Sequence, residues 1–303
     1  MFFADMASLQ LMLFCLILVG MIMKKANVIR AEGQKALSDL LLNAVLPCNI
    51  VHSFMGGVQA SGEFVRNCVW MFFLSVGIQL AAIYGSRMLF FKYQKAQKNV
   101  LSYGIICSNS SFIGLPVAET LFGDLGVMYT SVFQIPIRFT MWTAGLSLFT
   151  DVDKKDAFRK IIRHPCIVAI LIGVLVMVSP WPLPGVLNRS LQSVSQCTTP
   201  LSMFIIGSIL ADAPVRSLFS RTVFYYTFLR LIAFPVLVYL ILLPLQMDQL
   251  LCGICLLMTG MPAGSTTSIL ANQYGGDAAL ASEITFTSTL FSITTIPLLA
   301  CFL

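Results

Sequence analysis

Apolar segments of about 20 residues follow one another along almost the whole chain, and short polar connections separate them. A helix of that length crosses a hydrocarbon core of about 30 Å, so the pattern predicts an all-α integral membrane protein. Nothing is left over for a soluble domain. We predict ten transmembrane helices, at about 7–23, 36–55, 67–86, 99–121, 126–149, from 165 to the proline cluster that begins at 180, 190–211, from 221 through 235, 249–272 and 278–302.

Two of these segments, the fourth and the ninth, are interrupted near their middles. The fourth contains the polar run CSNSSFIGLPVAE over Cys107–Glu119, and the ninth contains GMPAGS over Gly260–Ser265. Proline removes a backbone donor and clashes with the preceding turn. Such breaks are tolerated at bilayer depth only where the freed backbone groups are buried in protein or line a wet cavity. Interrupted helices in corresponding halves of a chain indicate the binding site of a secondary transporter.

Composition supports a membrane protein and excludes several other classes. The 303 residues are 57% hydrophobic and 11% charged, which leaves too little polar surface to cover a soluble fold. The nine cysteines lack the spacing of a disulfide framework, and we interpret them as small buried hydrophobes. Cys252 and Cys255 form a lone CxxC inside a predicted membrane helix, and we favour core packing over a redox or metal role for this pair. Only two separated histidines are present, without an HExxH or GxSxG motif. We therefore expect no enzymatic activity, no metal, no cofactor and no nucleic-acid partner.

Basic residues are distributed unequally between the two sides of the predicted helix set. Fifteen of the 19 lysines and arginines lie in the connections that follow helices 1, 3, 5 and 7. By the positive-inside rule these connections are cytoplasmic, which places both termini outside. We expect a multi-pass protein of the cell inner (plasma) membrane.

Proline positions suggest an internal repeat. Pro47 and Pro200, Pro116 and Pro262, and Pro136 and Pro297 are separated by similar distances in the chain. Helices 2, 4 and 5 then correspond to helices 7, 9 and 10. Two halves that each cross the membrane five times must have opposite orientation, so we predict two inverted five-helix repeats, residues 1–150 and 151–303.

Three stretches resemble the bacterial branch of the auxin efflux carrier family. They are GMIMKKANVIRAEGQKALSDLLLNAVLPCNIVHSF, NSSFIGLPVAETLFGD and MPAGSTTSILANQYGGDAALASEITFTSTLFSITTIPL. The resemblance implies a ten-helix transporter in which helices 4 and 9 cross at their prolines. It also implies a scaffold of helices 1, 2, 6 and 7, a moving part made of the other six, and a homodimer through the scaffold. The loop from Asp151 to Arg163 is short, so the large cytoplasmic insert of the plant members is absent, and the bacterial branch is associated with malonate and similar organic acids.

The crossing of helices 4 and 9 is the predicted substrate site. The second half of each helix begins there, and the unpaired N–H groups and helix dipoles attract an anion. The alternative is that the small polar residues merely satisfy broken backbone or let helices approach closely. The candidate binding residues at the crossing are Asn109, Ser110, Ser111, Pro116, Pro262, Gly264, Ser265 and Thr266.

An arginine inside helix 5 is the remaining candidate for substrate binding. Placing Arg138 at that depth costs about 2.5–3.5 kcal/mol, so it needs a partner. That partner is either a substrate carboxylate, which the guanidinium holds with two hydrogen bonds, or a protein acid such as Glu119 or Glu283, or freed carbonyls. Arg230 is nearer the start of its helix, where snorkelling to the membrane surface favours a structural role.

Two acids near predicted helix starts have two interpretations. Asp39 and Glu283 complement the helix dipole if they lie in a first turn. The alternative is that they couple transport to protons.

Together these features predict a secondary active transporter that moves a small organic anion, a malonate-like or auxin-like carboxylate, by alternating access. Its expected partners are that anion and the lipid bilayer. The competing hypothesis is a channel, or a membrane sensor derived from a transporter, that binds a small carboxylate.

Overall fold

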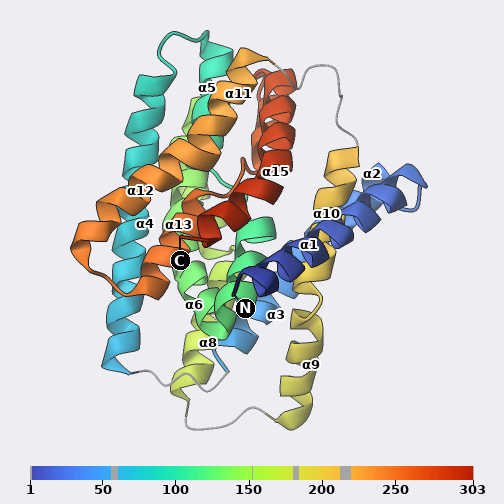
Figure 1. The fold of residues 1–303 in the computed structure, drawn as a ribbon, viewed down its shortest axis with the longest axis vertical. Coiled ribbons are helices and arrows are strands. Elements are labelled where there is room, and N and C mark those ends of the chain that lie inside the picture. Colours follow the sequence, from blue (N-terminus) through green and yellow to red (C-terminus); the bar gives the residue numbers. More distant parts are fainter. Residues whose placement is uncertain (1, 56–60, 152, 180–183, 212–219, 303) are drawn as a thin grey trace. The chain divides into compact units, whose positions relative to one another are not determined.

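The computed structural model describes residues 2–55, 61–151, 153–179, 184–211 and 220–302, and within these ranges it contains helices and no strand (Figure 1). The elements in chain order are α1 (Phe2–Lys25), α2 (Ala31–Leu40), η1 (Leu41–Val45), α3 (Leu46–Ser53), α4 (Gly62–Leu89), α5 (Lys95–Ile106), η2 (Ser110–Gly114), α6 (Leu115–Thr140), η3 (Met141–Gly145), η4 (Leu146–Leu148), α7 (Lys154–Ile162), α8 (Pro165–Val178), α9 (Gly185–Ser195), α10 (Thr198–Ala211), α11 (Arg221–Phe228), η5 (Leu229–Ala233), α12 (Phe234–Leu242), η6 (Leu243–Leu245), α13 (Gln249–Thr259), α14 (Thr266–Gln273) and α15 (Ala278–Ala300).

The apolar helices fit a membrane environment. By length and composition five stretches of the described chain can cross a membrane: Gly62–Leu89, Ser110–Leu148, Gly185–Ala211, Arg221–Leu245 and Ala278–Ala300. A sixth arises if Lys155–Ile162 and Pro165–Val178, which meet at a bend of 50°, count as one span. Large apolar side chains such as Phe73, Leu175 and Leu237 are exposed, as expected where helices face lipid. The all-helical membrane class is confirmed, whereas the number of ten spans stays a prediction.

Some of the predicted features lie outside the described residues. These are Arg216 of the connection between predicted helices 7 and 8, and Pro180 and Pro182 of the proline cluster.

Most of the π-helical turns in the described chain accompany a proline. The segments η1, η2 and η5 each end two residues before one, at Pro47, Pro116 and Pro235. A proline cannot donate to the carbonyl four residues earlier and crowds it. The widened turn gives that carbonyl room, so the chain stays helical through the proline instead of kinking sharply.

The chain folds into two compact units, and each contains segments from both halves of the sequence. Unit 1 comprises Met1–Trp70, Ser111–Val132 and Ile162–Asp212, and unit 2 comprises Met71–Ser110, Phe133–Ile161 and Ala213–Leu303. These units describe which segments pack together, whereas the predicted repeats describe a symmetry between residues 1–150 and 151–303. The first does not test the second. The division into repeats therefore stays a prediction.

Unit 1 contains a very close approach of α1 and α10 (Figure 1). A Cβ atom added at Gly20 would overlap the backbone of Phe204, and one added at Gly207 would overlap the carbonyl oxygen of Ile17. Small residues allow membrane helices to approach until their backbones are in contact. These two glycines therefore hold α1 and α10 together by dispersion contacts.

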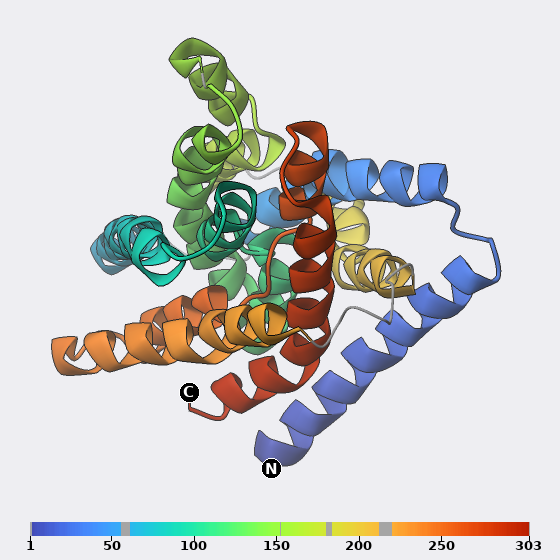
Figure 2. The same ribbon diagram turned by 90° about the horizontal axis from the view of Figure 1, so that it is seen from above.

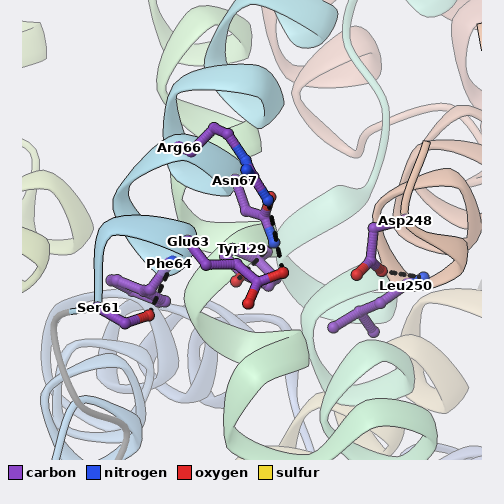
Figure 3. A network of polar contacts seen from close by, with 8 residues as sticks. All are labelled: Ser61, Glu63, Phe64, Arg66, Asn67, Tyr129, Asp248 and Leu250. Carbon is purple, nitrogen blue, oxygen red and sulfur yellow. Dashed lines mark hydrogen bonds and ion pairs between the residues drawn. The ribbon is translucent and has the colours of Figure 1, made fainter.

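The start of α4 packs on the later part of α6 in the same unit (Figure 3). The ring of Phe64 stacks on Tyr129 with 5.5 Å between centroids, and Asn67 Nδ2 lies 3.5 Å from the Tyr129 hydroxyl. Arg66 and Glu63 form an exposed pair at 3.5 Å, which contributes little in water. The aromatic contact is therefore the main attachment at this position.

Unit 2 contains α11, η5 and α12 as one continuous helical rod, drawn in orange in Figure 2. The helix α15 crosses it and contacts α11. The core of unit 2 includes Tyr103, Tyr226 and Phe90, all fully buried. A Cβ at Gly104 would overlap the Tyr226 hydroxyl, so glycine is required for α5 to lie this close to α11.

Candidate functional site

The two interrupted helices meet inside unit 2 as a pair of short extended segments. The first segment is Cys107–Asn109, directly after α5, and the second follows α13. Ser108 and Ala263 form an antiparallel bridge. The N–H of Asn109 donates to the carbonyl of Pro262 at 2.8 Å, and the N–H of Gly264 donates to the carbonyl of Cys107 at 3.0 Å. The two breaks thus satisfy each other's backbone groups, as bilayer depth requires.

The residue types at the second break explain how this contact forms. Gly260 caps the end of α13, and Pro262 has no N–H, so only its carbonyl needs a partner. A Cβ at Gly264 would lie 3.2 Å from the Cys107 carbonyl oxygen and 3.2 Å from Thr266 Oγ1. Glycine therefore lets the two backbones approach. The N–H of Ala263, between them, donates to Ser288 Oγ of α15 at 3.1 Å.

A buried arginine joins the ends of the two first half-helices. Arg230 Nε donates to the carbonyl of Met261 at 2.8 Å, and Nη1 donates to the carbonyl of Ile105 at 2.9 Å. The carbonyl ends of helices carry partial negative charge and stabilise a cation. Arg230 is only 2% exposed, so the predicted snorkelling is wrong, although its structural role is supported by these contacts. Its position between two helix ends could not be inferred from its place near the start of one helix.

Arg138 reaches the first break through a glutamine. Its Nη2 donates to Gln134 Oε1 at 3.2 Å, and Gln134 Nε2 donates to the carbonyl of Ser110 at 3.1 Å. Arg138 is half-buried, whereas Gln134 is buried. The guanidinium is therefore linked through Gln134 to Ser110, the last residue of the first break in unit 2.

Buried hydroxyl groups lie beside the crossing on two elements. Tyr103 and Thr267 are completely buried; the Thr267 hydroxyl is enclosed without a hydrogen-bond partner, and the Tyr103 hydroxyl lies beside the polar side chains of Cys107 and Thr266. The charged and polar neighbours that act on the Tyr103 hydroxyl include Cys107, Thr266 and Arg138. A buried hydroxyl without a partner loses free energy unless another group takes the hydrogen bond. These positions are suited to a polar ligand.

Sequence reasoning missed three of these residues. Tyr103 is one helical turn before Cys107, and Gln134 is one turn before Arg138. This spacing puts each pair on one face of a helix, and it is the signal that could have found both residues. Ser288 lies in a run of serines and threonines on α15, of which Thr289 and Ser292 bond to their own helix. Nothing in that run distinguishes the residue that supports the second break.

The other predicted site residues have the following positions. Ser265 and Thr266 are half-buried at the start of α14, and Asn109 and Ser110 are buried in the first break. Ser111 lies in η2 and Pro116 is the second residue of α6, both in unit 1. The extended contact is therefore at Ser108 and Asn109, earlier in the chain than the predicted crossing point at Pro116.

The two acids considered for proton coupling lie on different units. Asp39 is exposed and is the ninth of the ten residues of α2 in unit 1, so it is not in a first turn and does not complement a helix start. Glu283 is half-exposed on α15 in unit 2, one turn beyond the start of that helix. Within the described residues, no group of three histidines, cysteines or acids could hold a metal ion.

An open cavity of about 580 Å³ lies at one end of unit 2. It is lined by the start of α5, including Lys95 and Asn99, by residues 147–151 after η3, and by residues 274–276 after α14. Asn99 Nδ2 donates to the carbonyl of Leu148 across this end. Three connections of the chain therefore gather around one polar opening.

A family model described as membrane transport protein matches residues 8–300. The chain belongs to the membrane transport protein family. The predicted membership in the auxin efflux carrier family is confirmed by this match. It follows that the protein is a multi-pass membrane protein with a small-molecule substrate.

Relatives of this family member are similar over most of the chain. An uncharacterized transporter of Methanocaldococcus jannaschii is 24% identical and covers 95% of this chain and 96% of its own. An uncharacterized transporter of Methanothermobacter thermautotrophicus is 23% identical, with 98% of both chains covered. A protein of Rhizobium meliloti named "Putative malonate transporter" is 24% identical over 62% of each chain. These names indicate transport, a function that generally involves no enzymatic chemistry.

Proposed function

We propose that the protein is a secondary active transporter that moves a small organic anion across the plasma membrane by alternating access. The observation that carries the proposal is the antiparallel contact of Ser108 with Ala263, because it brings two interrupted helices together in the way that transporter binding sites are built.

An anion is the ligand that the residues at the crossing favour. The second half-helix α14 begins there with Ser265 and Thr266 partly exposed, so N–H groups and hydroxyl donors are available. Arg138 adds a guanidinium, which binds a carboxylate with two parallel hydrogen bonds. We therefore assign substrate binding to this group together with Asn109, Ser110, Ser111, Pro116, Pro262 and Gly264.

We also propose ten membrane helices in two inverted repeats with both termini outside. The predicted helices 2 and 7 each deviate from regular α-helix just before Pro47 and Pro200, and helices 4 and 9 each break. The 3–4, 5–6 and 9–10 connections line one cavity, which agrees with their placement on one side of the membrane. The charge distribution makes that side cytoplasmic.

The packing of the chain supports a scaffold and a transport part. Unit 1 contains predicted helices 1, 2, 6 and 7, which the family resemblance assigns to the scaffold, and unit 2 contains the contact of Ser108 with Ala263. Unit 1 also contains Ser111–Val132, from predicted helices 4 and 5, so the match with the two parts is incomplete. A homodimer through the scaffold helices and proton coupling by Asp39 or Glu283 stay predictions.

Malonate is the first substrate to test, because a relative carries that name and two carboxylates match a site with a guanidinium and a helix start. The experiment is uptake of labelled malonate and of an aromatic carboxylate into proteoliposomes. A carrier gives saturable uptake that an excess of unlabelled substrate inhibits. Flux that rises linearly with concentration favours the competing channel hypothesis, and binding without flux favours a sensor.

A further inference from the structure

A second polar site lies in unit 1, formed by side chains that the crossing does not use. Asn49 of α3, Glu119 of α6 and Ser195 of α9 meet there. Asn49 Nδ2 donates to Glu119 Oε1 at 2.9 Å and lies 3.4 Å from Ser195 Oγ. Asn49 is 2% exposed and Ser195 is 5% exposed, so the amide and the hydroxyl are enclosed by protein.

Two oxygens of this group have no hydrogen-bond partner. They are Glu119 Oε2 and Asn49 Oδ1, and both atoms are fully enclosed. Each is an acceptor if the carboxyl is ionised, so neither can satisfy the other. An enclosed polar atom without a partner costs about 1–3 kcal/mol, and more when it carries charge. Some further atom must therefore belong to this site.

A single proton on Glu119 satisfies both oxygens. A protonated carboxyl has one O–H donor, which can bond to Asn49 Oδ1 while Asn49 Nδ2 continues to donate to Oε1. An acid and a primary amide then form a ring of two hydrogen bonds, and the buried pair carries no net charge. A metal cation fits less well, because hard cations take six or more oxygens and this pair offers two unused ones.

The charges around the carboxyl agree with a neutral form. Asp124, just beyond the break in α6 at Gly123, is the charged group that acts on it, and like charge disfavours ionisation. The other titratable residues on these helices are Cys48 and His52 on α3, Tyr129 and Arg138 on α6 and Arg189 on α9, and α8, which packs against α3, carries Cys166.

We propose that Glu119 and Asn49 form a buried proton-binding site, and that this proton is exchanged during transport. The second part rests on the proposed function. It assigns coupling to a residue that the sequence suggested only as a partner for Arg138, in place of Asp39, which is exposed, and Glu283, which is half-exposed.

The first test uses infrared difference spectroscopy on the purified full chain at neutral pH. The expected result is a carbonyl band of a protonated carboxyl that shifts in deuterium oxide and is absent from Glu119→Gln. The glutamine amide can donate to Asn49 Oδ1 as the acid does, so this variant should keep the thermal stability of the wild type. A wild-type spectrum without that band overturns the proposal. The proposal is also overturned if sodium chloride raises the thermal stability of the wild type more than choline chloride does and Glu119→Gln loses this difference. That result would favour a cation site.

The second test measures malonate uptake into proteoliposomes with and without an imposed pH difference. The pH difference should stimulate uptake by the wild type and not by Glu119→Gln, which should still exchange internal for external substrate. Equal stimulation of both overturns the coupling role. If the wild type takes up no organic anion, the proposed function fails, and the infrared result still decides whether the proton site exists.

Discussion

The main-chain N–H of Asn109 donates to the main-chain carbonyl of Pro262 over 2.8 Å, so the contact between the two interrupted helices does not use the asparagine side chain. The side-chain amide of Asn109 is therefore available to bind a ligand. A substitution that removes only this side chain tests ligand binding and leaves the backbone contact between the two segments in place.

Asn109→Ala should keep the fold and weaken anion binding. A hydrogen bond to a charged carboxylate contributes about 1.5–3 kcal/mol, so the dissociation constant should rise about 10- to 150-fold. Calorimetry on the purified variant measures this change, with Asn272→Ala, an exposed asparagine of α14, as the control. Unchanged affinity in Asn109→Ala would remove this side chain from the site.

Arg138→Lys should insert and fold normally but transport poorly. Lysine keeps the charge and loses the planar fork that holds a carboxylate with two bonds. Uptake in proteoliposomes and surface expression, measured on the same preparation, separate these effects. Wild-type transport by Arg138→Ala would show that the residue serves the structure through Gln134 and not the substrate.

Arg230→Ala should lower stability whether or not substrate is present. It leaves the carbonyls of Ile105 and Met261 without their donors, at about 1–3 kcal/mol for each group left unpaired. Thermal unfolding in detergent measures the loss, and Arg221→Ala, an exposed arginine on the same helical rod, is the matched control. Equal melting temperatures for the two variants would mean that the buried contacts contribute nothing.

Gly207→Ala should separate α1 from α10 and destabilise unit 1, because its Cβ would overlap the Ile17 carbonyl. The control is Gly77→Ala on α4, where the added Cβ meets nothing within 4 Å. Alanine is favoured over glycine in a helix by about 0.8–1 kcal/mol, so the control should be at least as stable as the wild type. The prediction fails if both variants melt alike.

Cysteines introduced by Lys155→Cys and Gly275→Cys should react with an impermeant reagent only from the cytoplasmic side, and one introduced by Gln246→Cys only from outside. The first two belong to connections 5–6 and 9–10 and the third to connection 8–9. Labelling of Lys155→Cys and Gly275→Cys from opposite sides would contradict the inverted orientation of the two repeats.

The sequence predicted the all-helical membrane class because bilayer thickness fixes the length of apolar segments and few charges interrupt them. The gap between the predicted helices 99–121 and 126–149 corresponds to a break in α6 at Gly123, whose φ of 60° favours glycine. Polar runs and prolines located both breaks. The adjacency of the breaks was inferred, and the backbone bonds between Asn109 and Pro262 agree with it.

What the sequence could not provide were the partners of polar groups on distant segments. Arg230 looked like a surface-seeking arginine because its depth was judged from one helix, whereas its partners come from α5 and from the end of α13. Asn49 and Glu119 drew no attention as a pair, because 70 positions separate them and neither stands in a recognisable motif. Long-range pairing of this kind depends on packing, which periodicity does not encode.

The two bonds of Arg230 also restrict how the molecule can move. If α5 moved away from the end of α13, the buried guanidinium of Arg230 would lose at least one of its two carbonyl acceptors, which costs free energy because a buried charge would be less well compensated. The first halves of the two interrupted helices must therefore travel as a pair during any conformational cycle. In the proposed alternating-access cycle, the substrate would therefore meet the same paired segments from either face of the membrane, and the surrounding elements would open and close the site.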